Sequence, residues 1–223
     1  RLFDMEGSIK GIWQETYIPY LGPDGYIYTL LSGNEALQTI EFASLDSNGE
    51  LRWSITHGLK NTSLSYCNSV WFDKQNNVYF LINHTSEVPQ TSQLVLYSFT
   101  SDGLARWKKS FPENIQIQYL QESQIIQSYM LFSLSREQQT DNAETSVQYN
   151  IIALDVDGNE IWRKEEKRNG IFSVPFRIGE NNRTISAFSS SEEDIAFLKA
   201  TNDKGETMWE RKLSSKEVSP MIK

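Results

Sequence analysis

The sequence has few of the residues on which metal, redox and nucleophile sites depend. Of its 223 residues only one is a cysteine and two are histidines: Cys67, His57 and His84. A single cysteine excludes a disulfide within the chain and any motif built from paired cysteines. Two histidines argue against a multi-histidine metal site, and neither accompanies a sharp nucleophile turn of the kind that supports a Ser-His-Asp triad.

Long apolar runs and basic clusters are also scarce. No apolar run approaches the roughly 20 residues that a membrane-spanning helix needs, so we expect no transmembrane segment. Acidic residues outnumber basic residues by 29 to 21, a formal net charge of −8, and the basic residues are scattered except within residues 164–168. Because nucleic acids bind through concentrated positive charge, this composition argues against a nucleic-acid partner.

A unit with a glycine turn and a tryptophan occurs four times in the sequence. In each copy an Asp, Thr or Asn lies three residues before a glycine, and a tryptophan lies four residues after it. The glycines are 54, 55 and 47 residues apart, and a degraded copy without the tryptophan occupies residues 3–7. Small polar residues followed by glycine suit a tight turn between two antiparallel strands. The four copies are residues 46–53, 100–107, 155–162 and 202–209.

Strand-forming sequence precedes each of these turns. Residues 26–31 and 78–82 alternate or are rich in β-branched and aromatic side chains, and residues 125–134 and 184–188 hold the corresponding places later. Further turn sequences lie before the strands, so each unit offers about four strands. This period predicts an all-β fold, a β-propeller of about four blades with four antiparallel strands each. The expected blades, in one propeller domain or propeller fragment over residues 1–223, are residues 14–56, 57–111, 112–167 and 168–214.

The unit Leu-Asp-x-x-Gly-x-x-x-Trp, preceded by Gly-x-Ile-Tyr at residues 25–28, resembles the pyrroloquinoline-quinone-like propeller repeat. The resemblance extends over nearly the whole chain and implies kinship in shape with WD-repeat propellers. Thr100 and Asn202 depart from the aspartate that the repeat carries at this position. Propellers of that family usually have seven or eight blades, so the chain either closes as a four-bladed propeller or is part of a larger one. We favour the larger propeller, because both ends of the sequence interrupt a unit.

The resemblance leaves the activity open, because the repeat occurs in quinoprotein dehydrogenases, in assembly scaffold lipoproteins and in other extracytoplasmic proteins. A dehydrogenase site of that family carries adjacent cysteines, which Cys67 alone does not supply. The tryptophans recur at one position of the unit, so we interpret them as packing residues and not as a platform for a cofactor. Residues 155–159 with Glu166 faintly resemble a calcium loop, but the glycine is fourth and not sixth. We therefore expect no catalytic, cofactor-binding or metal-binding residue.

Three further interpretations concern single residues and segments. Cys67 is expected to be a small apolar residue in a strand, and His57 and His84 to lie in loops or at strand ends. Likeness to arylsulfate sulfotransferase propellers would single out His57 if the chain were catalytic. Residues 83–93 and 136–146 are the least similar to the repeat, so we expect loops that contact a partner there.

The leading hypothesis is a non-catalytic β-propeller scaffold that binds a protein partner outside the cytoplasm, a location that the resemblance implies. One alternative is part of a quinoprotein-like or sulfotransferase-like propeller enzyme. The other is a propeller at a cell surface that binds carbohydrate or peptide, with Trp13 and Trp71 as stacking residues.

Overall fold

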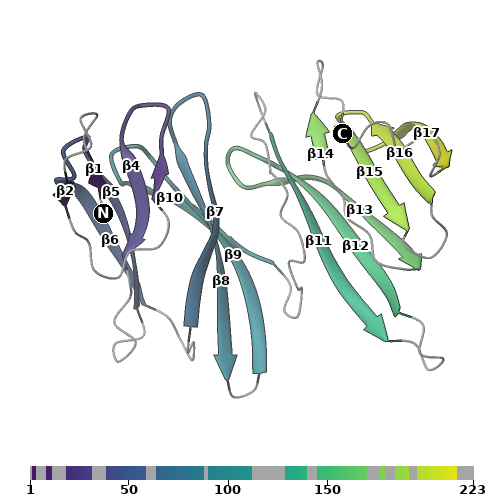
Figure 1. The fold of residues 1–223 in the computed structure, drawn as a ribbon, viewed down its shortest axis with the longest axis horizontal. Coiled ribbons are helices and arrows are strands. Elements are labelled where there is room, and N and C mark those ends of the chain that lie inside the picture. The colour runs from purple at the N-terminus through teal and green to yellow at the C-terminus, as the bar shows by residue number, and fades with distance from the viewer. Residues whose placement is uncertain are drawn as a thin grey trace. The chain divides into compact units, whose positions relative to one another are not determined.

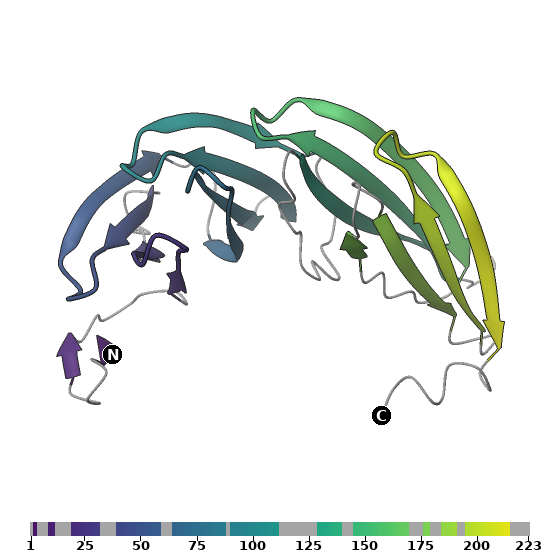
Figure 2. The same ribbon diagram turned by 90° about the horizontal axis from the view of Figure 1, so that it is seen from above.

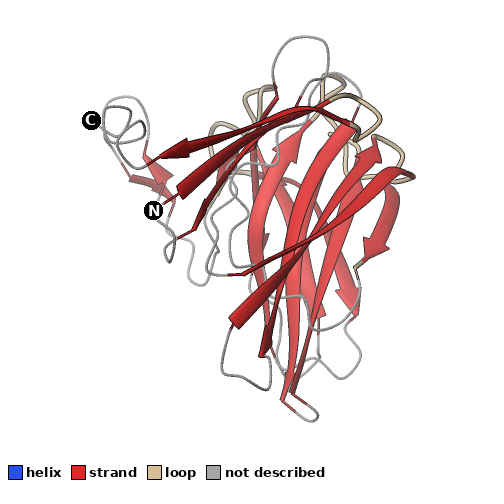
Figure 3. Cartoon of the chain, turned by 90° about the vertical axis from the view of Figure 1, so that its right-hand side faces the viewer, coloured by secondary structure: helices blue, strands red, loops and turns tan. Residues whose placement is uncertain are grey.

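The described part of the chain consists of β-strands joined by turns, as the computed structural model shows (Figure 3). Contacts between residues divide the chain into two units, Arg1–Asn114 and Ile115–Lys223. No helix long and apolar enough to cross a membrane occurs among the described residues. The structure describes residues 2–3, 9–11, 19–31, 39–58, 64–87, 90–111, 129–139, 145–169, 176–178, 184–190 and 195–214.

The first unit holds two four-stranded antiparallel sheets in which strands adjacent in sequence are hydrogen-bonded neighbours (Figure 1). A separate pair, β1 (Leu2–Phe3) and β2 (Ile9–Gly11), precedes them. The first sheet consists of β3 (Tyr20–Leu21), β4 (Ile27–Leu31), β5 (Thr39–Leu45) and β6 (Leu51–Gly58). The second sheet consists of β7 (Leu64–Phe72), β8 (Val78–Glu87), β9 (Gln90–Phe99) and β10 (Ala105–Ser110).

The second unit has the same strand order within its sheets. The third sheet contains three strands among the described residues, β11 (Tyr129–Gln139), β12 (Thr145–Asp155) and β13 (Glu160–Asn169). The fourth sheet contains β14 (Phe176–Ile178), β15 (Thr184–Ser190), β16 (Ile195–Thr201) and β17 (Thr207–Ser214). The expectation of an all-β fold built from antiparallel sheets is confirmed, and three of these sheets have the expected four strands among the described residues.

The last two strands of each sheet are joined by the turn that the sequence predicted. In all four turns the glycine N–H donates to the carbonyl three residues earlier at 3.0 to 3.1 Å, and the glycine φ lies between 78° and 86°. The residue that begins the turn also accepts backbone hydrogen bonds through its side chain. Asp46 Oδ1, for example, accepts from the amides of Asn48 and Glu50 at 2.8 and 2.9 Å. Short polar side chains stabilise turns in this way, which explains why Asp, Thr or Asn occupies the position.

A β-bulge follows each turn and directs the tryptophan. In the first sheet Leu51 pairs with Leu45 but Trp53 pairs with Ser44, so Arg52 is the extra residue. The same shift precedes Trp107, Trp162 and Trp209. Because side chains alternate between the faces of a strand, one extra residue changes the face on which the tryptophan lies.

Two of these tryptophans dock on the glycine turn of the next sheet, in what we call the tryptophan–glycine joint. Trp53 Nε1 donates to the carbonyl of Ser101 at 2.8 Å, and a Cβ added at Gly103 would lie 2.7 Å from the indole ring. In the second unit Trp162 Nε1 donates to the carbonyl of Asp203 at 2.9 Å, and a Cβ added at Gly205 would also lie 2.7 Å from the ring. The joint therefore needs a residue without a side chain.

The core of the first unit contains residues of both of its sheets, which are neighbours in Figure 2. Phe42 at its centre is fully buried, and its ring centroid lies 4.9 to 5.0 Å from those of Phe80, Tyr97 and Phe99 in tilted geometry. Tilted aromatic pairs at such distances add to the hydrophobic gain of burying the rings. This cluster fixes the two sheets against one another, and with them the residues considered below.

The expectation that residues 83–93 and 136–146 form loops is wrong for most of both segments. Strands β8 and β9 pair as far as Glu87 with Gln90, and β11 and β12 as far as Gln139 with Thr145. Residues 88–89 and 140–144 lie outside the described part. The polar composition of these segments was misleading, because polar residues also form strands where a neighbouring strand supplies partners for the backbone hydrogen bonds. Here β7 pairs with β8 to Thr85, and β13 pairs with β12 to Ser146.

Two glycines of the first unit allow the contribution of the tryptophan–glycine joint to the free energy of unfolding to be measured. Gly25 and Gly103 have φ of 81° and 86°, but a Cβ at Gly25 would meet nothing within 4 Å. We expect Gly25→Ala to lower the free energy of unfolding by about 1 kcal/mol, the strain of an L-residue at positive φ. Gly103→Ala should cost about 3 kcal/mol, because it also displaces Trp53. Urea denaturation of both variants checks this, and equal losses would contradict the joint.

Candidate functional site

The two histidines of the chain come together at one tyrosine of the first unit. Tyr97 on β9 lies with its hydroxyl oxygen 3.0 Å from His84 Nε2 on β8. The ring of His57, on β6, meets the Tyr97 ring edge-on with centroids 5.2 Å apart, and the His84 ring does so at 6.0 Å. Lys108 on β10 pairs with Tyr97 across the strands. Four side chains that can donate or accept protons, from four strands, thus meet at one place.

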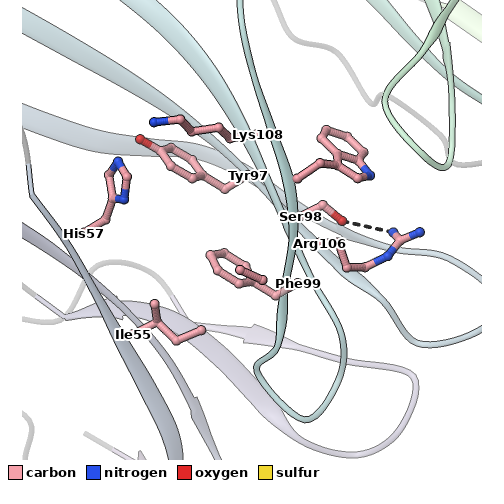
Figure 4. Close-up of a pocket in the computed structure, with 9 residues that line it drawn as sticks. Ile55, His57, Tyr97, Ser98, Phe99, Arg106 and Lys108 are labelled. Carbon is pink, nitrogen blue, oxygen red and sulfur yellow. Dashed lines mark hydrogen bonds between the residues drawn. The ribbon is translucent and has the colours of Figure 1, made fainter.

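A recess of about 270 Å³ opens beside this cluster, between β6 and the β9–β10 hairpin. Figure 4 shows the tips of Tyr97 and Lys108 side by side and facing His57, with Ile55 and Phe99 beneath them. Arg106 and Ser98 lie on the other side of the hairpin and are hydrogen-bonded to each other at 3.0 Å. The residues that line the recess are Ile55, His57, Tyr97, Ser98, Phe99, Ala105, Arg106, Trp107 and Lys108.

Burial and the lysine set the charges around the recess. Burial, together with the charges of His57 and Lys108, lowers the pKa of His84 to about 4. Burial, with the charge of Lys108, also lowers the pKa of His57 below its ordinary value. Burial raises the pKa of Tyr97 to about 12. At neutral pH both imidazoles are therefore uncharged and the phenol keeps its proton. Of the two basic residues that line the recess, Lys108 is the one whose tip faces His57.

A second polar cluster holds the hairpin in place from the opposite side. Asp73 Oδ2 accepts a hydrogen bond of 2.7 Å from the Tyr79 hydroxyl, to whose oxygen Arg106 Nη1 donates at 2.9 Å. Burial and the Asp73 carboxylate raise the pKa of Tyr79. In the first sheet Tyr28 donates to Asp24 Oδ2 at 2.6 Å in the same manner. Because its partners engage both the proton and the oxygen of Tyr79, we assign this cluster a structural role.

The structure places the other residues that the sequence singled out as follows. His57 is the penultimate residue of β6, near a strand end as expected, whereas His84 lies well inside β8 and is only 7% exposed, which corrects the expectation of a loop or strand end. A histidine is tolerated there because the Tyr97 hydroxyl satisfies Nε2. Trp71 is half-buried in β7, and Trp13 lies outside the described residues.

Cys67 and the calcium-like segment have ordinary structural surroundings. Cys67 is half-buried in β7 against the aromatic core, and burial raises the pKa of its thiol to about 12, so it is protonated and unreactive at neutral pH. Asp155 Oδ1 accepts hydrogen bonds from the amides of Asp157 and Asn159 at 3.0 and 2.8 Å, as a turn residue does. In the described part, no three His, Cys, Asp or Glu side chains are grouped to hold a metal ion.

Sequence reasoning missed Tyr97 and Lys108, although one signal could have found them as a pair. Once Gly103 is taken as the turn of a hairpin with a bulge, the register that places Trp107 opposite Ser98 also places Lys108 opposite Tyr97. No sequence signal of this kind predicts that His57 packs against Tyr97, because His57 belongs to the other sheet of the unit.

The buried His84 makes the stability of the first unit depend on pH. Its pKa falls from 6.5 when unfolded to about 4 when folded, so between these values the unfolded chain binds more protons. The free energy of unfolding should therefore fall as pH is lowered from 6.5 to 4, by about 3 kcal/mol in total. Urea titrations of wild type and His84→Gln between pH 4 and 7.5 measure this. The variant should lose most of this slope, and parallel profiles would contradict the assignment.

No protein-family model matches the sequence, and no curated protein matches it.

Proposed function

We propose that the chain is a non-catalytic β-propeller scaffold that binds a protein partner outside the cytoplasm. The propeller is supported by the sheets of strands in sequential order and by the two tryptophan–glycine joints, which connect the first sheet to the second and the third to the fourth with the same geometry. A propeller arises where such joints continue from one sheet to the next. The resemblance of the repeat to extracytoplasmic propellers supports the location.

The exposure of Trp209 in the fourth sheet, within the described part of the chain, is the observation that carries the binding function. Trp209 pairs with Ala200 across β16 and β17, as Trp53 pairs with Ser44 and Trp162 with Ala153. Trp53 and Trp162 are half-buried beneath a glycine turn, whereas Trp209 is 45% exposed. The same indole position is thus docked in the first and third sheets and exposed in the fourth.

The residues beside Trp209 extend this apolar surface. Ile185 on β15 pairs with Ala200, so Ile185, Ala200 and Trp209 form one row across three strands. Ile185 is 40% exposed, whereas Tyr28, which holds the equivalent place in the first sheet opposite Ser44, is fully buried against the second sheet. Ala200 itself is buried, so Ile185 and Trp209 are the exposed members of this row. Exposed apolar side chains near one another are typical of protein-binding surfaces, and tryptophan is enriched among the residues that dominate the binding energy.

The joint also indicates what the partner presents to this face. An indole ring packs against a backbone without a side chain, and its N–H needs a carbonyl in reach, as Ser101 and Asp203 provide. A β-hairpin turn that contains glycine offers both. The proposed partner therefore approaches with such a turn. Residues 83–87 of β8 and 136–139 of β11, which lie at the ends of their hairpins, are not required for this contact.

A selection with a displayed library of cyclic β-hairpin peptides tests the proposal. We expect the strongest binders to carry glycine in the turn and to lose at least tenfold in affinity, 1.4 kcal/mol or more, when the target carries Trp209→Ser. Leu104, an exposed apolar residue of the first unit, supplies the matched control, because Leu104→Ser should leave binding unchanged. Binders that Trp209→Ser does not affect would overturn the assignment of this face.

A further inference from the structure

The recess beside Tyr97 separates into an apolar floor and a polar rim. Ile55 on β6 and Phe99 on β9 form the floor together with the ring of Tyr97. His57, the tip of Lys108 and the Tyr97 hydroxyl form the rim, and Figure 4 shows these three groups facing one another. An occupant that fits both parts has an apolar body and a polar head directed at the lysine.

The charges around the recess have one sign. None of its nine lining residues is acidic, although acidic residues outnumber basic ones in the chain. Among the groups that face it, β6 contributes His57, β8 contributes His84 behind Tyr97, and β10 contributes Lys108. Arg106 is turned to the other side and bound to Tyr79 and Ser98. On β5, Glu41 alternates with the inward-facing Ile40 and Phe42 and pairs with Thr56, on the other face from His57.

We propose that this recess binds a carboxylate carried on an aromatic or branched apolar stem. The stem packs on Ile55, Phe99 and the Tyr97 ring, and the carboxylate lies between Lys108 and His57. One ammonium group matches one carboxylate, and a hydrogen bond with an ionised partner is about twice as strong as a neutral one. A volume of about 270 Å³ lies just below the range of pockets for whole ligands, so it suits a single ring with a short acidic arm.

Tyr97 can donate a hydrogen bond to this carboxylate because of His84. When neutral His84 carries its proton on Nε2, it donates to the Tyr97 oxygen 3.0 Å away and leaves the phenolic hydrogen for the ligand. His84 is then a positioning residue that does not contact the ligand. The buried Tyr97 phenol keeps its proton over the whole range in which the carboxylate is ionised.

Two sources can supply this chemistry, a free small acid and the C-terminal residue of a peptide. Both present one carboxylate on an apolar stem. The recess belongs to the first unit and does not include Trp209, so the inference stands or fails independently of the proposed function.

The two histidines provide a direct readout, because the chain has no others to overlap with their imidazole signals in NMR spectra. We expect 3-phenylpropionate to shift the His57 signal in a saturable way and to raise the pKa of His57, because a nearby anion favours the protonated imidazole. By linkage, binding then tightens as pH falls through the His57 pKa. The neutral isostere 3-phenylpropionamide should bind at least tenfold more weakly. Equal binding of acid and amide, or no shift at millimolar acid, would overturn the proposal.

Matched variants assign the charge to one residue. Lys108→Gln should weaken binding of the acid about tenfold or more, whereas Lys109→Gln, the adjacent lysine on the other face of β10, should not. If Lys108→Gln failed to fold, Tyr97→Phe would serve instead, with unchanged far-UV circular dichroism as its control and a several-fold loss of affinity expected. Equal effects of the two lysine substitutions would contradict the site.

Short peptides ending in phenylalanine distinguish the two sources. If the natural ligand is a chain terminus, Gly-Gly-Phe with a free carboxylate should bind more tightly than 3-phenylpropionate, and its amide should not bind. If the ligand is a small acid, the peptide should bind more weakly than 3-phenylpropionate. Either result supports the carboxylate site, and equal binding of the peptide acid and the peptide amide would overturn it.

Discussion

The packing of an indole ring on a bare glycine is the interaction on which the rest of the structure depends. Glycine meets two requirements at this point: its backbone adopts the positive φ that the turn needs, and it has no Cβ to collide with the ring. The indole N–H donates to a carbonyl of the same turn, so its hydrogen-bonding capacity is satisfied when the ring packs there. The bulge before each tryptophan is part of the same device, since it turns the ring toward its partner.

In the first unit this joint also positions the recess. Trp53, Ile55 and His57 alternate along β6 and lie on the face that packs against the second sheet. A slip of one residue in the pairing of β6 would turn all three to the opposite face. The joint fixes Trp53 at one end of the strand, and His57 is thereby held against Tyr97 at the other. A contact that serves packing thus determines where the polar rim of the recess lies.

The sequence predicted the features that local chemistry determines. The glycine turns, the positions of the tryptophans and the all-β antiparallel character follow from short motifs, and the structure agrees with them. Residues 83–87 and 136–139 were misjudged because their polarity reflects exposure, while their strand pairing depends on neighbours such as β7 and β13. The meeting of His57, His84 and Tyr97 was beyond prediction, since it depends on how two sheets pack and no motif in either sheet records it.

A hairpin of this repeat contains both partners of the joint, a turn glycine and a tryptophan. The hairpin of Gly103 receives Trp53 and itself bears Trp107, and that of Gly205 receives Trp162 and bears Trp209. The contact therefore has a direction along the chain, because in both described joints the ring comes from the earlier sheet. A duplication of one such segment would add a new tryptophan and a new glycine turn together. Chains of this kind can lengthen or shorten by whole sheets during evolution, and no new surface has to arise for the added sheet to fit.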